Sequence, residues 1–310
     1  MEKSIRVFSP ASVSNVGPGF DLMGFAINNL GDEIIIRKNN LNKIRITKIT
    51  GDNSKLPKDV NKNTAGVGII ALLKYFNLHV GLDIEINKKM GIGSGLGSSA
   101  ASAAGAVYAV NKLLELKLSK KALLPFAMIG EKAASGAIHA DNVAPSLLGG
   151  FRLIASYEPL DIQKVHTPDN LYCSVVYPDI EIKTSEARKM ISKYVPIKKT
   201  IAQVGRATAL IMALERSDWE LMNRVLIDEI AEPKRASLIP CYDRVRTAAL
   251  LAGAVNCNIS GSGPSMFAFS NSKNSAMNIA KAIGNACQQK NIQAKSFVTK
   301  INNLGTIILE

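Results

Sequence analysis

The fold of this chain is decided by the stretch Gly91-Ile92-Gly93-Ser94-Gly95-Leu96-Gly97-Ser98-Ser99-Ala100-Ala101. Residues 81–87, just before it, alternate apolar and polar side chains and predict a strand. Residues 100–116, just after it, carry apolar side chains at helical spacing. A loop of glycines lets backbone N–H groups close around an anion, and the helix start adds unpaired N–H groups and the positive end of its dipole. The order of strand, glycine loop and helix therefore predicts a phosphate-binding loop.

Two common phosphate-binding motifs do not fit this loop. The Walker motif needs a lysine after its last glycine, and Ser98 follows Gly97 here. The dinucleotide fingerprint needs a glycine at its sixth position, where counting from Gly91 gives Leu96. The run Gly95-Leu96-Gly97-Ser98-Ser99-Ala100 instead resembles the signature of the GHMP kinase family, whose loop usually begins with proline where this chain has Gly91. Without its flanking segments, the loop would fit an ordinary glycine-rich turn before a packed helix about equally well.

The composition indicates a globular protein. A chain of 310 residues can form one large or two ordinary domains, and 47% hydrophobic with 20% charged residues is typical of soluble proteins. No apolar run is long enough to cross a bilayer, and residues 1–7 lack the apolar core of a signal peptide, so we expect a cytoplasmic protein. The four cysteines fit no metal-ligand spacing and are expected to be reduced and mostly buried: Cys173, Cys241, Cys257 and Cys287.

The net charge of +13 leaves several interpretations open. Lysines occur in pairs, such as Lys88-Lys89, Lys120-Lys121 and Lys198-Lys199, and no aromatic side chains interleave with them as a stacking platform would need. Most of this charge is therefore interpreted as solvated surface, with attraction of ATP as a further effect. A nucleic-acid-binding protein is the alternative, but we expect neither a nucleic-acid nor a membrane partner.

A second loop follows a predicted strand at residues 5–13. The run Ser14-Asn15-Val16-Gly17-Pro18-Gly19-Phe20-Asp21 contains two glycines and a proline, which mark a tight turn. Asn15 and Asp21 also favour turns for their own reasons. Residues 11–21 nonetheless resemble the first motif of the GHMP kinases, in the branch of that family that phosphorylates homoserine. That resemblance implies that Asn15 and Asp21 face an amino-acid substrate.

Strands are also expected at 33–38 and 43–50, followed by a helix that begins at Asn63 and runs to about residue 76. Asn63 is interpreted first as the cap of that helix. In the resembled family this segment lies beside the adenine, which makes Asn63 an expected nucleotide contact as well.

The third informative stretch is residues 130–145, which follows a helix predicted at 119–134 with Ser119 as its cap. It gathers Glu131, His139, Asp141 and Asn142 among small residues. Taken singly, such a glutamate would more often lie on a surface helix, and such a histidine would have a structural role. The resemblance implies that Glu131 binds magnesium, and that His139 and Asn142 line the substrate pocket.

Strands are expected at 151–157 and 171–177, with a loop near 158–168 that separates a domain at 1–160 from one at 161–310. Thr184 or Ser185 is expected to cap a helix that carries Arg188. By resemblance, Arg188 and Arg235 hold a substrate carboxylate, which planar guanidinium groups bind through two hydrogen bonds, and Thr184 lies near the metal and phosphates. Helices at 199–215, 217–230, 239–252 and 275–290 and strands at 296–301 and 306–309 complete the expected elements.

A last glycine loop, residues 258–269, would alone be interpreted as a β-turn. It resembles the third GHMP motif, which packs against the phosphate loop. Together the motifs imply an α+β fold of two domains, an N-terminal α/β domain like that of a ribosomal protein and a ferredoxin-like C-terminal domain.

The resemblance implies ATP-dependent phosphorylation of the side-chain hydroxyl of L-homoserine in threonine biosynthesis, by a homodimer. Residues 91–101 would cradle the phosphates of ATP, Ser99 and Glu131 would hold Mg²⁺, and Asn142 would complete the catalytic set. An asparagine is no base at neutral pH, so we expect the proton to pass to phosphate or solvent, with Asp141 as the alternative acceptor. A kinase for another small alcohol, such as mevalonate or shikimate, is the competing interpretation within the family.

Overall fold

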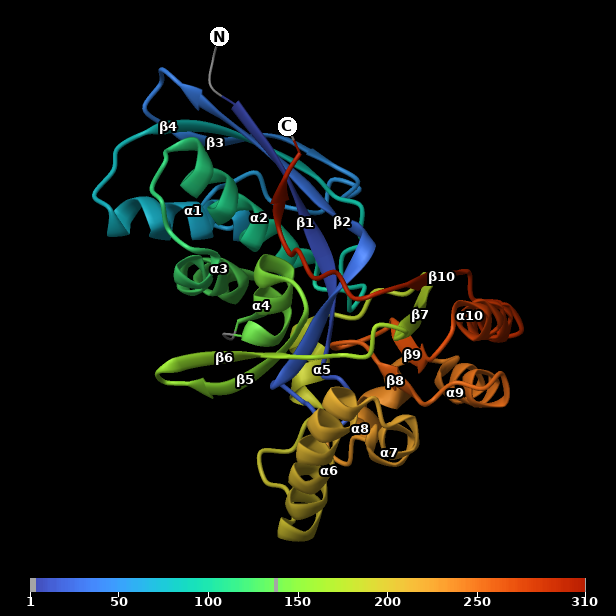
Figure 1. Cartoon of the computed structure of the whole chain (residues 1–310). Coiled ribbons are helices and arrows are strands. Elements are labelled where there is room, and N and C mark those ends of the chain that lie inside the picture. Colours follow the sequence, from blue (N-terminus) through green and yellow to red (C-terminus); the bar gives the residue numbers. More distant parts are fainter. Residues whose placement is uncertain (1–3, 137–138, 310) are drawn as a thin grey trace.

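The structure, a computed structural model, describes residues 4–136 and 139–309. Its first sheet contains β1 (Ser4–Ser14), β2 (Met23–Asn39), β3 (Ile44–Thr50), β4 (Gly81–Asn87), β5 (Phe151–Tyr157), β6 (Leu160–Val165) and β11 (Ile307–Ile308). The second contains β7 (Tyr172–Pro178), β8 (Cys257–Ile259), β9 (Met266–Ser270) and β10 (Ala294–Thr299). The combination of these sheets with separate groups of helices is an α+β architecture, as predicted (Figure 1).

The first sheet has the order β11-β1-β2-β4-β3, and the β5–β6 hairpin pairs with the start of β2. Its apolar side chains alternate along each strand, as in Ile34 and Ile36 of β2 and Leu82, Ile84 and Ile86 of β4. Four helices cover one face of the sheet: α1 (Thr64–Tyr75), α2 (Ser98–Leu113), α3 (Lys120–Ser135) and α4 (Ala140–Leu148) (Figure 1). The strand, glycine loop and helix predicted around residue 91 are β4, the loop and α2.

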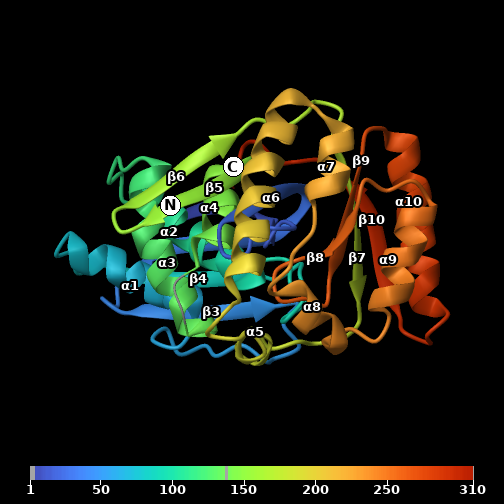
Figure 2. The same ribbon diagram turned by 90° about the horizontal axis from the view of Figure 1, so that it is seen from below.

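The second sheet has the order β10-β7-β9-β8, with every neighbouring pair antiparallel. In chain order this is fourth, first, third and second strand, which is the ferredoxin-like arrangement expected for the C-terminal part. The helices α9 (Tyr242–Leu251) and α10 (Lys273–Gln288) pack on its outer face (Figure 2). The remaining helices are α5 (Thr184–Lys189), α6 (Ile197–Arg216), α7 (Trp219–Val225), α8 (Glu232–Arg235) and the 3₁₀ turn Ala236–Leu238.

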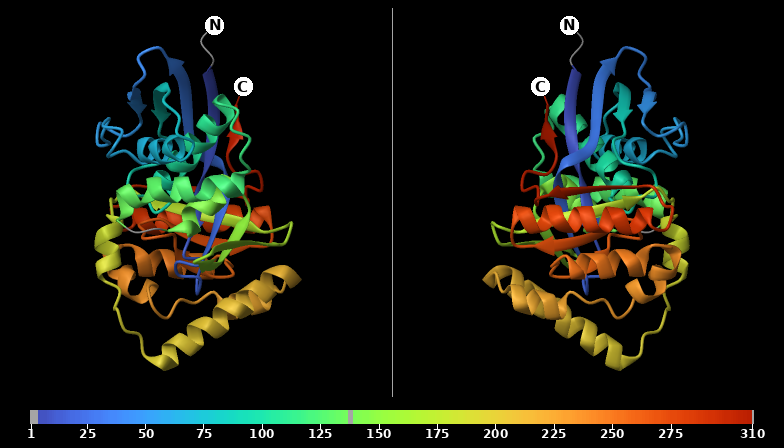
Figure 3. Two further views of the ribbon diagram at one scale, coloured as in Figure 1. Left: turned by 90° about the vertical axis from the view of Figure 1, so that its left-hand side faces the viewer. Right: turned by 90° about the vertical axis from the view of Figure 1, so that its right-hand side faces the viewer.

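Phenylalanines join the two sheets. Phe25 of β2 lies with its ring centroid 5.8 Å from that of Phe267 and 5.4 Å from that of Phe269, both on β9, and it stacks on Phe151 of β5. Leu96, inside the glycine loop, and Ala101, at its end, belong to the same buried cluster. The loop is therefore anchored in the core where the two sheets meet. The long helix α6 projects beyond this core (Figure 3).

Three sequence-based expectations about local structure are wrong, and one helix was not anticipated. Residues 160–165 form β6 rather than a loop, because they pair with β5 from Phe151↔Val165 to Tyr157↔Leu160. Residues 140–148 form α4, which was not expected. The helix α5 is capped by the backbone of Lys183, with Thr184 as its first residue. The predicted helix 217–230 ends at Val225, because Asp228 accepts hydrogen bonds from the backbone N–H groups of residues 230, 231 and 232 and so begins α8.

The change from the first sheet to the second falls between β6 and β7, and β11 returns to the first sheet next to β1. The division into domains at residue 160 stays a prediction.

The four cysteines are buried free thiols, and the sulfur atoms of Cys241 and Cys287 lie 3.2 Å apart. Among the helices in the described ranges, none has the length and apolar character needed to cross a membrane.

Candidate active site

The glycine loop is held in shape by the loop between β8 and β9. Gly93, Gly95 and Gly97 all have positive φ angles, which favour glycine. The Ser260 hydroxyl donates to the backbone carbonyl of Gly95 at 2.7 Å, and a Cβ added to Gly95 would lie 2.6 Å from the backbone oxygen of Ser260. The expected packing of the last glycine loop against the phosphate loop is thus confirmed, and it leaves no room for a side chain at residue 95.

The loop borders a cavity of about 400 Å³ that extends to the β1–β2 loop and to α5 and α8. Most of the predicted site residues line it, although they come from six separate segments: Asn15, Asp21, Asn63, Ile92, Gly93, Ser94, Gly95, Gly97, Ser98, Ser99, Glu131, His139, Asn142, Thr184, Arg188 and Arg235. Asp141 lines it as well. Of the other predicted nucleotide contacts, the side chains of Leu96, Ala100 and Ala101 are buried in the core, and Gly91 lies outside the lining of this cavity.

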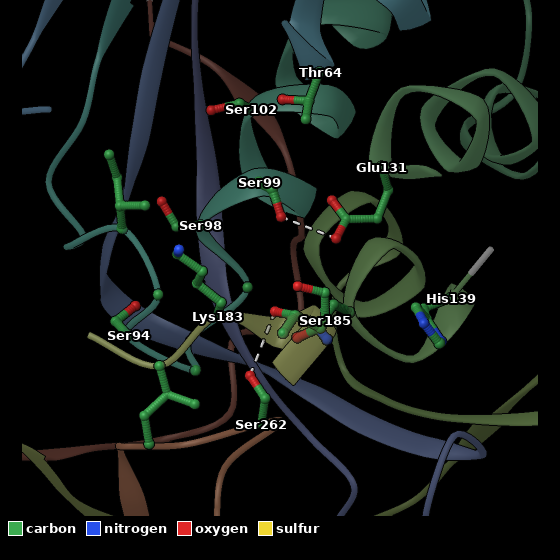
Figure 4. A pocket seen from close by; sticks show the side chains of 18 of the residues that line it. Thr64, Ser94, Ser98, Ser99, Ser102, Glu131, His139, Lys183, Ser185 and Ser262 are labelled. Carbon is green, nitrogen blue, oxygen red and sulfur yellow. Dashed lines mark hydrogen bonds between the residues drawn. The ribbon is translucent and has the colours of Figure 1, made fainter. Parts of the chain in front are cut away.

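Ser99 and Glu131 meet inside the cavity (Figure 4). Ser99 is in the first turn of α2 and donates its hydroxyl proton to Oε1 of Glu131, on α3, at 2.9 Å. Burial raises the pKa of Glu131 to about 7, with a further rise from the nearby carboxylate of Asp141, while the bond from Ser99 opposes the shift. A cation beside this carboxylate would favour its ionised form.

These two oxygen donors suit a hard cation such as Mg²⁺. Within residues 4–136 and 139–309, no group of three or more His, Cys, Asp or Glu side chains is arranged to hold a metal ion. The donor set therefore fits an ion that takes most of its remaining ligands from water and from phosphate oxygens, which is how Mg²⁺ binds with nucleotides.

Lys88 lies beneath the loop and corrects the interpretation of the Lys88-Lys89 pair as surface charge. It is 5% exposed and forms an ion pair with the buried Asp32. Its ammonium also donates to the backbone carbonyl of Ser98 at 2.7 Å and to the hydroxyl of Ser102 at 2.9 Å. The ion pair between Lys88 and Asp32 thus fixes the first turn of α2, where N–H groups that face the ligand are expected.

Asn142 is held by two serines of β1. The Ser12 hydroxyl donates to its Oδ1 at 2.8 Å, and its Nδ2 donates to the hydroxyl of Ser14 at 2.8 Å. Asn15 is similarly engaged, because its Nδ2 donates to the backbone carbonyl of Gly261 and its Oδ1 accepts from the backbone N–H of Asp21. Both amides connect the loops that form the cavity wall.

The far end of the cavity concentrates charge. Nη1 of Arg188 lies 2.6 Å from Oδ2 of Asp21, and Nδ1 of His139 lies 3.6 Å from Oδ1 of the same carboxylate. The guanidinium carbons of Arg188 and Arg235 each lie 5.2 Å from the ring centroid of Phe20. Burial lowers the pKa of His139, and the two arginines add to this effect while Asp21 opposes it, which favours a neutral imidazole.

Arg235 is positioned by the capping contacts of Asp228. The Asp228 carboxylate accepts hydrogen bonds from the backbone N–H groups of residues 230–232, where α8 begins. Nε2 of Gln203 donates to the same carboxylate at 3.0 Å. The Arg235 side chain then reaches the last glycine loop, where Nη1 donates to the backbone carbonyl of Gly261 at 2.8 Å.

The remaining predicted residues have clear local roles. Oδ1 of Asn63 accepts from the backbone N–H of Ala65 at 3.1 Å, so its capping role is confirmed, while a contact to adenine stays a prediction. The hydroxyl of Thr184 lies 3.4 Å from that of Ser262. Thr184 therefore bridges α5 and the last glycine loop.

Sequence reasoning assigned no role to Phe20, Asp32, Lys88 or Tyr157. The ring of Phe20 lies against the guanidinium groups of Arg188 and Arg235. The hydroxyl of Tyr157 donates to the backbone carbonyl of Asp21 at 2.9 Å. A usable pattern existed for Lys88, because Leu82, Ile84 and Ile86 alternate inward and the next residue in that series is 88. Asp32 likewise precedes the inward-facing Ile34 and Ile36 at a spacing of two, whereas no such pattern marks Phe20 or Tyr157.

Two family models match parts of the chain. A family model described as "GHMP kinases N terminal domain" matches residues 63–150, and one described as "GHMP kinases C terminal" matches residues 210–289. The chain is 43% identical to a homoserine kinase of Chlorobium phaeobacteroides, over 99% of this chain and 100% of that protein. It is 41% identical to a homoserine kinase of Methanococcus maripaludis, over 85% of this chain and 87% of that one.

Solved structures are similar as well. The crystal structure of homoserine kinase from Cytophaga hutchinsonii superimposes with a TM-score of 0.97 and 46% identity, covering 100% of this chain and 98% of that one. A mevalonate kinase of L. major, with 14% identity and a TM-score of 0.73 over 95% of both chains, shares the fold.

Proposed function

This chain belongs to the GHMP kinase family, and from that premise we propose that it transfers the γ-phosphate of ATP to the side-chain hydroxyl of L-homoserine. The product is O-phospho-L-homoserine, an intermediate of threonine biosynthesis. The observation that carries the proposal is the composition of one cavity: a glycine loop and helix start at one end, and two arginines with two carboxylates at the other. The first set suits phosphates, and the second suits an amino acid.

Residues 91–101 cradle the triphosphate in this proposal, mainly through backbone N–H groups of the loop and of the first turn of α2. Ser99 and Glu131 would hold Mg²⁺, and the ion would supply positive charge that offsets the charge of the phosphates. Asn63 lies beside the adenine. Lys88 keeps the helix start in place through its bond to the carbonyl of Ser98.

The substrate end uses charged side chains. Arg188 and Arg235 bind the carboxylate of homoserine, with His139 beside them and Thr184 near the phosphates. Asn15 and Asp21 orient the ammonium and hydroxyl end. Phosphoryl transfer has a loose transition state, so the alignment of the hydroxyl with the γ-phosphate and the neutralisation of charge supply most of the rate.

No protein base is needed in this scheme. Asn142 lacks a basic atom at neutral pH, and both ends of its amide are bonded to serine hydroxyls. Its role is to hold β1 and α4 together beside the transferred group. The hydroxyl proton passes to a phosphate oxygen or to solvent.

The proposal extends to a cytoplasmic homodimer. Besides the family expectation, support comes from exposed apolar side chains in and just before α6, the helix that projects from the core: Tyr194, Ile197, Ile201, Val204 and Met212. Light scattering coupled to gel filtration tests the dimer. A mass of one chain at micromolar concentration would contradict it.

A substrate panel tests the function. ADP release is followed with ATP and Mg²⁺ and with L-homoserine, mevalonate or shikimate as the acceptor. We expect turnover with L-homoserine at least about 100-fold above the other two, because mevalonate and shikimate carry a carboxylate but lack the ammonium group, so its contact with a carboxylate of the cavity is lost. Faster turnover with mevalonate or shikimate would assign the chain to another branch of the family.

A further inference from the structure

Two buried thiols meet outside the active-site cavity, between the helices that cover the second sheet. Cys241 immediately precedes α9, and Cys287 lies in the last turn of α10. These helices lie side by side on the outer face of the sheet (Figure 2). Both side chains are fully buried, and the S–H of Cys287 donates to Sγ of Cys241 at 3.2 Å. The two sulfur atoms are thus in contact without a covalent bond between them.

The two thiols are chemically unequal. The hydrogen bond from Cys287 lowers the pKa of Cys241, although burial opposes that effect. Cys241 also occupies the N-terminal cap position of α9, where the helix dipole favours a negative charge. The same hydrogen bond raises the pKa of Cys287, and burial adds to the rise. Cys241 is therefore the thiol that more readily becomes a nucleophilic thiolate, with Cys287 beside it.

A surface groove lies next to this pair of thiols. It is a cavity of about 350 Å³ between α9 and α10, and its lining includes residues close to the two thiols along the chain: Asp243, Arg244, Ala286 and Gln289. A guanidinium N–H of Arg244 donates to Oε1 of Gln289 at 3.3 Å, from one helix to the other. A molecule as small as hydrogen peroxide needs only local motion of side chains to pass from this groove to the thiols.

The segment that ends at Cys241 begins at Arg235, in the active site. Residues 236–240 join the two, and Ile239 packs against the last glycine loop. A Cβ added to Gly263 would lie 3.0 Å from Cδ1 of Ile239. A displacement of Cys241 is therefore transmitted along a short, packed segment to the substrate end of the cavity.

Tyr242 makes a second connection between the thiols and the site. It follows Cys241, and its hydroxyl donates to Oε1 of Glu232, on α8, at 2.7 Å. The other oxygen of that buried carboxylate accepts from Nδ2 of Asn258, on β8, at 3.0 Å. Glu232 thus joins the start of α9 to the helix that carries Arg235 and to the strand before the last glycine loop.

We propose that Cys241 and Cys287 form a reversible oxidation site for hydrogen peroxide, and that their disulfide weakens the binding of L-homoserine. The thiolate of Cys241 attacks one peroxide oxygen, so that an S–O bond forms, the O–O bond breaks, and hydroxide leaves and takes up a proton to give water. Sγ of Cys287 then attacks the sulfenic sulfur, so that the S–S bond forms, the S–O bond breaks, and the proton of Cys287 leaves with a second water. Two thiols and one peroxide become one disulfide and two waters, and a thiol reductant reverses the change.

The effect on the substrate follows from the position of the bond. A disulfide brings its sulfur atoms closer than two thiols in contact, so the start of α9 and residues 236–240 are drawn toward α10. The Arg235 guanidinium then loses its alignment with the carboxylate of L-homoserine. This consequence rests on the proposed function, whereas the oxidation itself does not.

Peptide mapping tests the oxidation site without any substrate. The full chain is treated with hydrogen peroxide, the remaining thiols are alkylated, and the protein is digested with trypsin. We expect the peptides 236–244 and 282–290 to be joined, Cys173 and Cys257 to be alkylated, and dithiothreitol to restore all four thiols. Alkylation of all four cysteines after peroxide, or a disulfide that includes Cys173 or Cys257, would overturn the inference.

Single variants test the order of the two steps. In Cys287→Ala, oxidation should stop at a sulfenic acid on Cys241, which dimedone labels. Cys241→Ala should leave Cys287 unlabelled under the same conditions. The opposite labelling would overturn the assignment of Cys241 as the attacking thiol. If thermal melting shows that a variant is unfolded, the peptide map of the wild type decides the inference alone.

Steady-state kinetics test the link to the substrate. Oxidation of the wild type should raise KM for L-homoserine about tenfold or more and change KM for ATP less than about threefold, with reversal by dithiothreitol. Cys173→Ala is the control, since this buried thiol on β7 lies in a different cluster and its loss should leave the response to peroxide unchanged. Joined peptides with an unchanged KM for L-homoserine would overturn the proposed effect on binding. Joined peptides in a protein that transfers no phosphate would contradict the proposed function and leave the oxidation site standing.

Discussion

Lys88 and Asp32 form a buried ion pair that continues the register of two neighbouring strands. Glu33 of β2 is paired with Asn87 of β4, so the next antiparallel positions are 32 and 88. Both side chains point to the helix-covered face, where Lys88 also contacts Ser98 and Ser102 of α2. The phosphate loop therefore begins and ends on elements that this ion pair holds together.

Replacing Lys88 with methionine should lower the free energy of unfolding by about 3–5 kcal/mol, because Asp32 would stay buried without its cation. Urea denaturation measures the loss. The neighbouring Lys89 is exposed, so Lys89→Met should change stability by less than about 0.5 kcal/mol. Adding Asp32→Asn to Lys88→Met should restore part of the loss. Equal stability of the two lysine variants would contradict this role.

Gly91 and Gly95 should respond differently to alanine. A Cβ on Gly91 would lie 1.9 Å from the hydroxyl oxygen of Tyr177, whereas one on Gly95 would meet backbone oxygens of the last glycine loop. Removing the side chain of Tyr177 should therefore restore activity only to the alanine variant at residue 91. We expect Tyr177→Ala to restore ATP turnover in Gly91→Ala and to have no such effect in Gly95→Ala. Rescue at both positions, or at neither, would show that the close contacts are not the cause.

The same contact gives a physical reason why the proline usual in the family is replaced here. A ring at residue 91 would need the space that the Tyr177 hydroxyl fills. Sequence analysis identified the departure at Gly91 but could not explain it, because Tyr177 is 86 positions away and on the other sheet. Contacts of this kind depend on the tertiary fold.

Arg235→Met should raise KM for L-homoserine about 100-fold, because a buried guanidinium–carboxylate contact is lost. KM for ATP should change less than about threefold, since Arg235 lies at the substrate end of the cavity. Lys234→Met provides the control, because Lys234 is the exposed neighbour on α8. Steady-state kinetics with each substrate varied in turn check both values. A large rise in KM for ATP alone would place Arg235 with the nucleotide.

Asp141→Asn should stabilise the ligand-free protein at neutral and alkaline pH. The pKa of Asp141 is raised to about 7 in the fold, above its usual value, so folding favours the protonated acid. The contribution of the Asp141 carboxyl to the free energy of unfolding is fully present below about pH 4, and it is lost as the pH rises to about 7. The difference in Tm between variant and wild type should therefore grow from pH 5 to 7, reach at least about 4 °C, and then level off. A difference that is constant with pH would contradict the raised pKa of Asp141.

The sequence predicted most helices and strands, but it did not predict how the charged side chains of the site are paired. Periodicity identified β4, α1, α3 and α10 within a few residues, because each has one buried face. The helix α2 is buried nearly all round and was identified together with the glycine loop that precedes it. It missed α4, whose short helix is mostly buried and has little polar face. It also missed β6, which is stabilised by pairing with β5 rather than by its own pattern.

The motifs indicated which residues face the cavity but not how they are paired. Asp21 was expected to face the substrate, which stays a prediction, and its contact with the Arg188 guanidinium was not anticipated. Oδ1 of Asp141 has no hydrogen-bond partner in the part of the chain that the structure describes, and this too became apparent only with its neighbours in place. Pairing of charges depends on side chains from α4, α5 and α8 that converge from distant parts of the sequence.

Phosphorus NMR tests the central claim most directly, namely that this cavity aligns the γ-phosphate of ATP with the hydroxyl of L-homoserine. The enzyme is incubated with ATP, Mg²⁺ and L-homoserine, and the phosphorus signals are followed with time. We predict a phosphomonoester signal of O-phospho-L-homoserine that grows in step with ADP and is absent with Gly95→Ala. Release of inorganic phosphate alone, or ATP that stays intact while L-homoserine is present, would contradict the account.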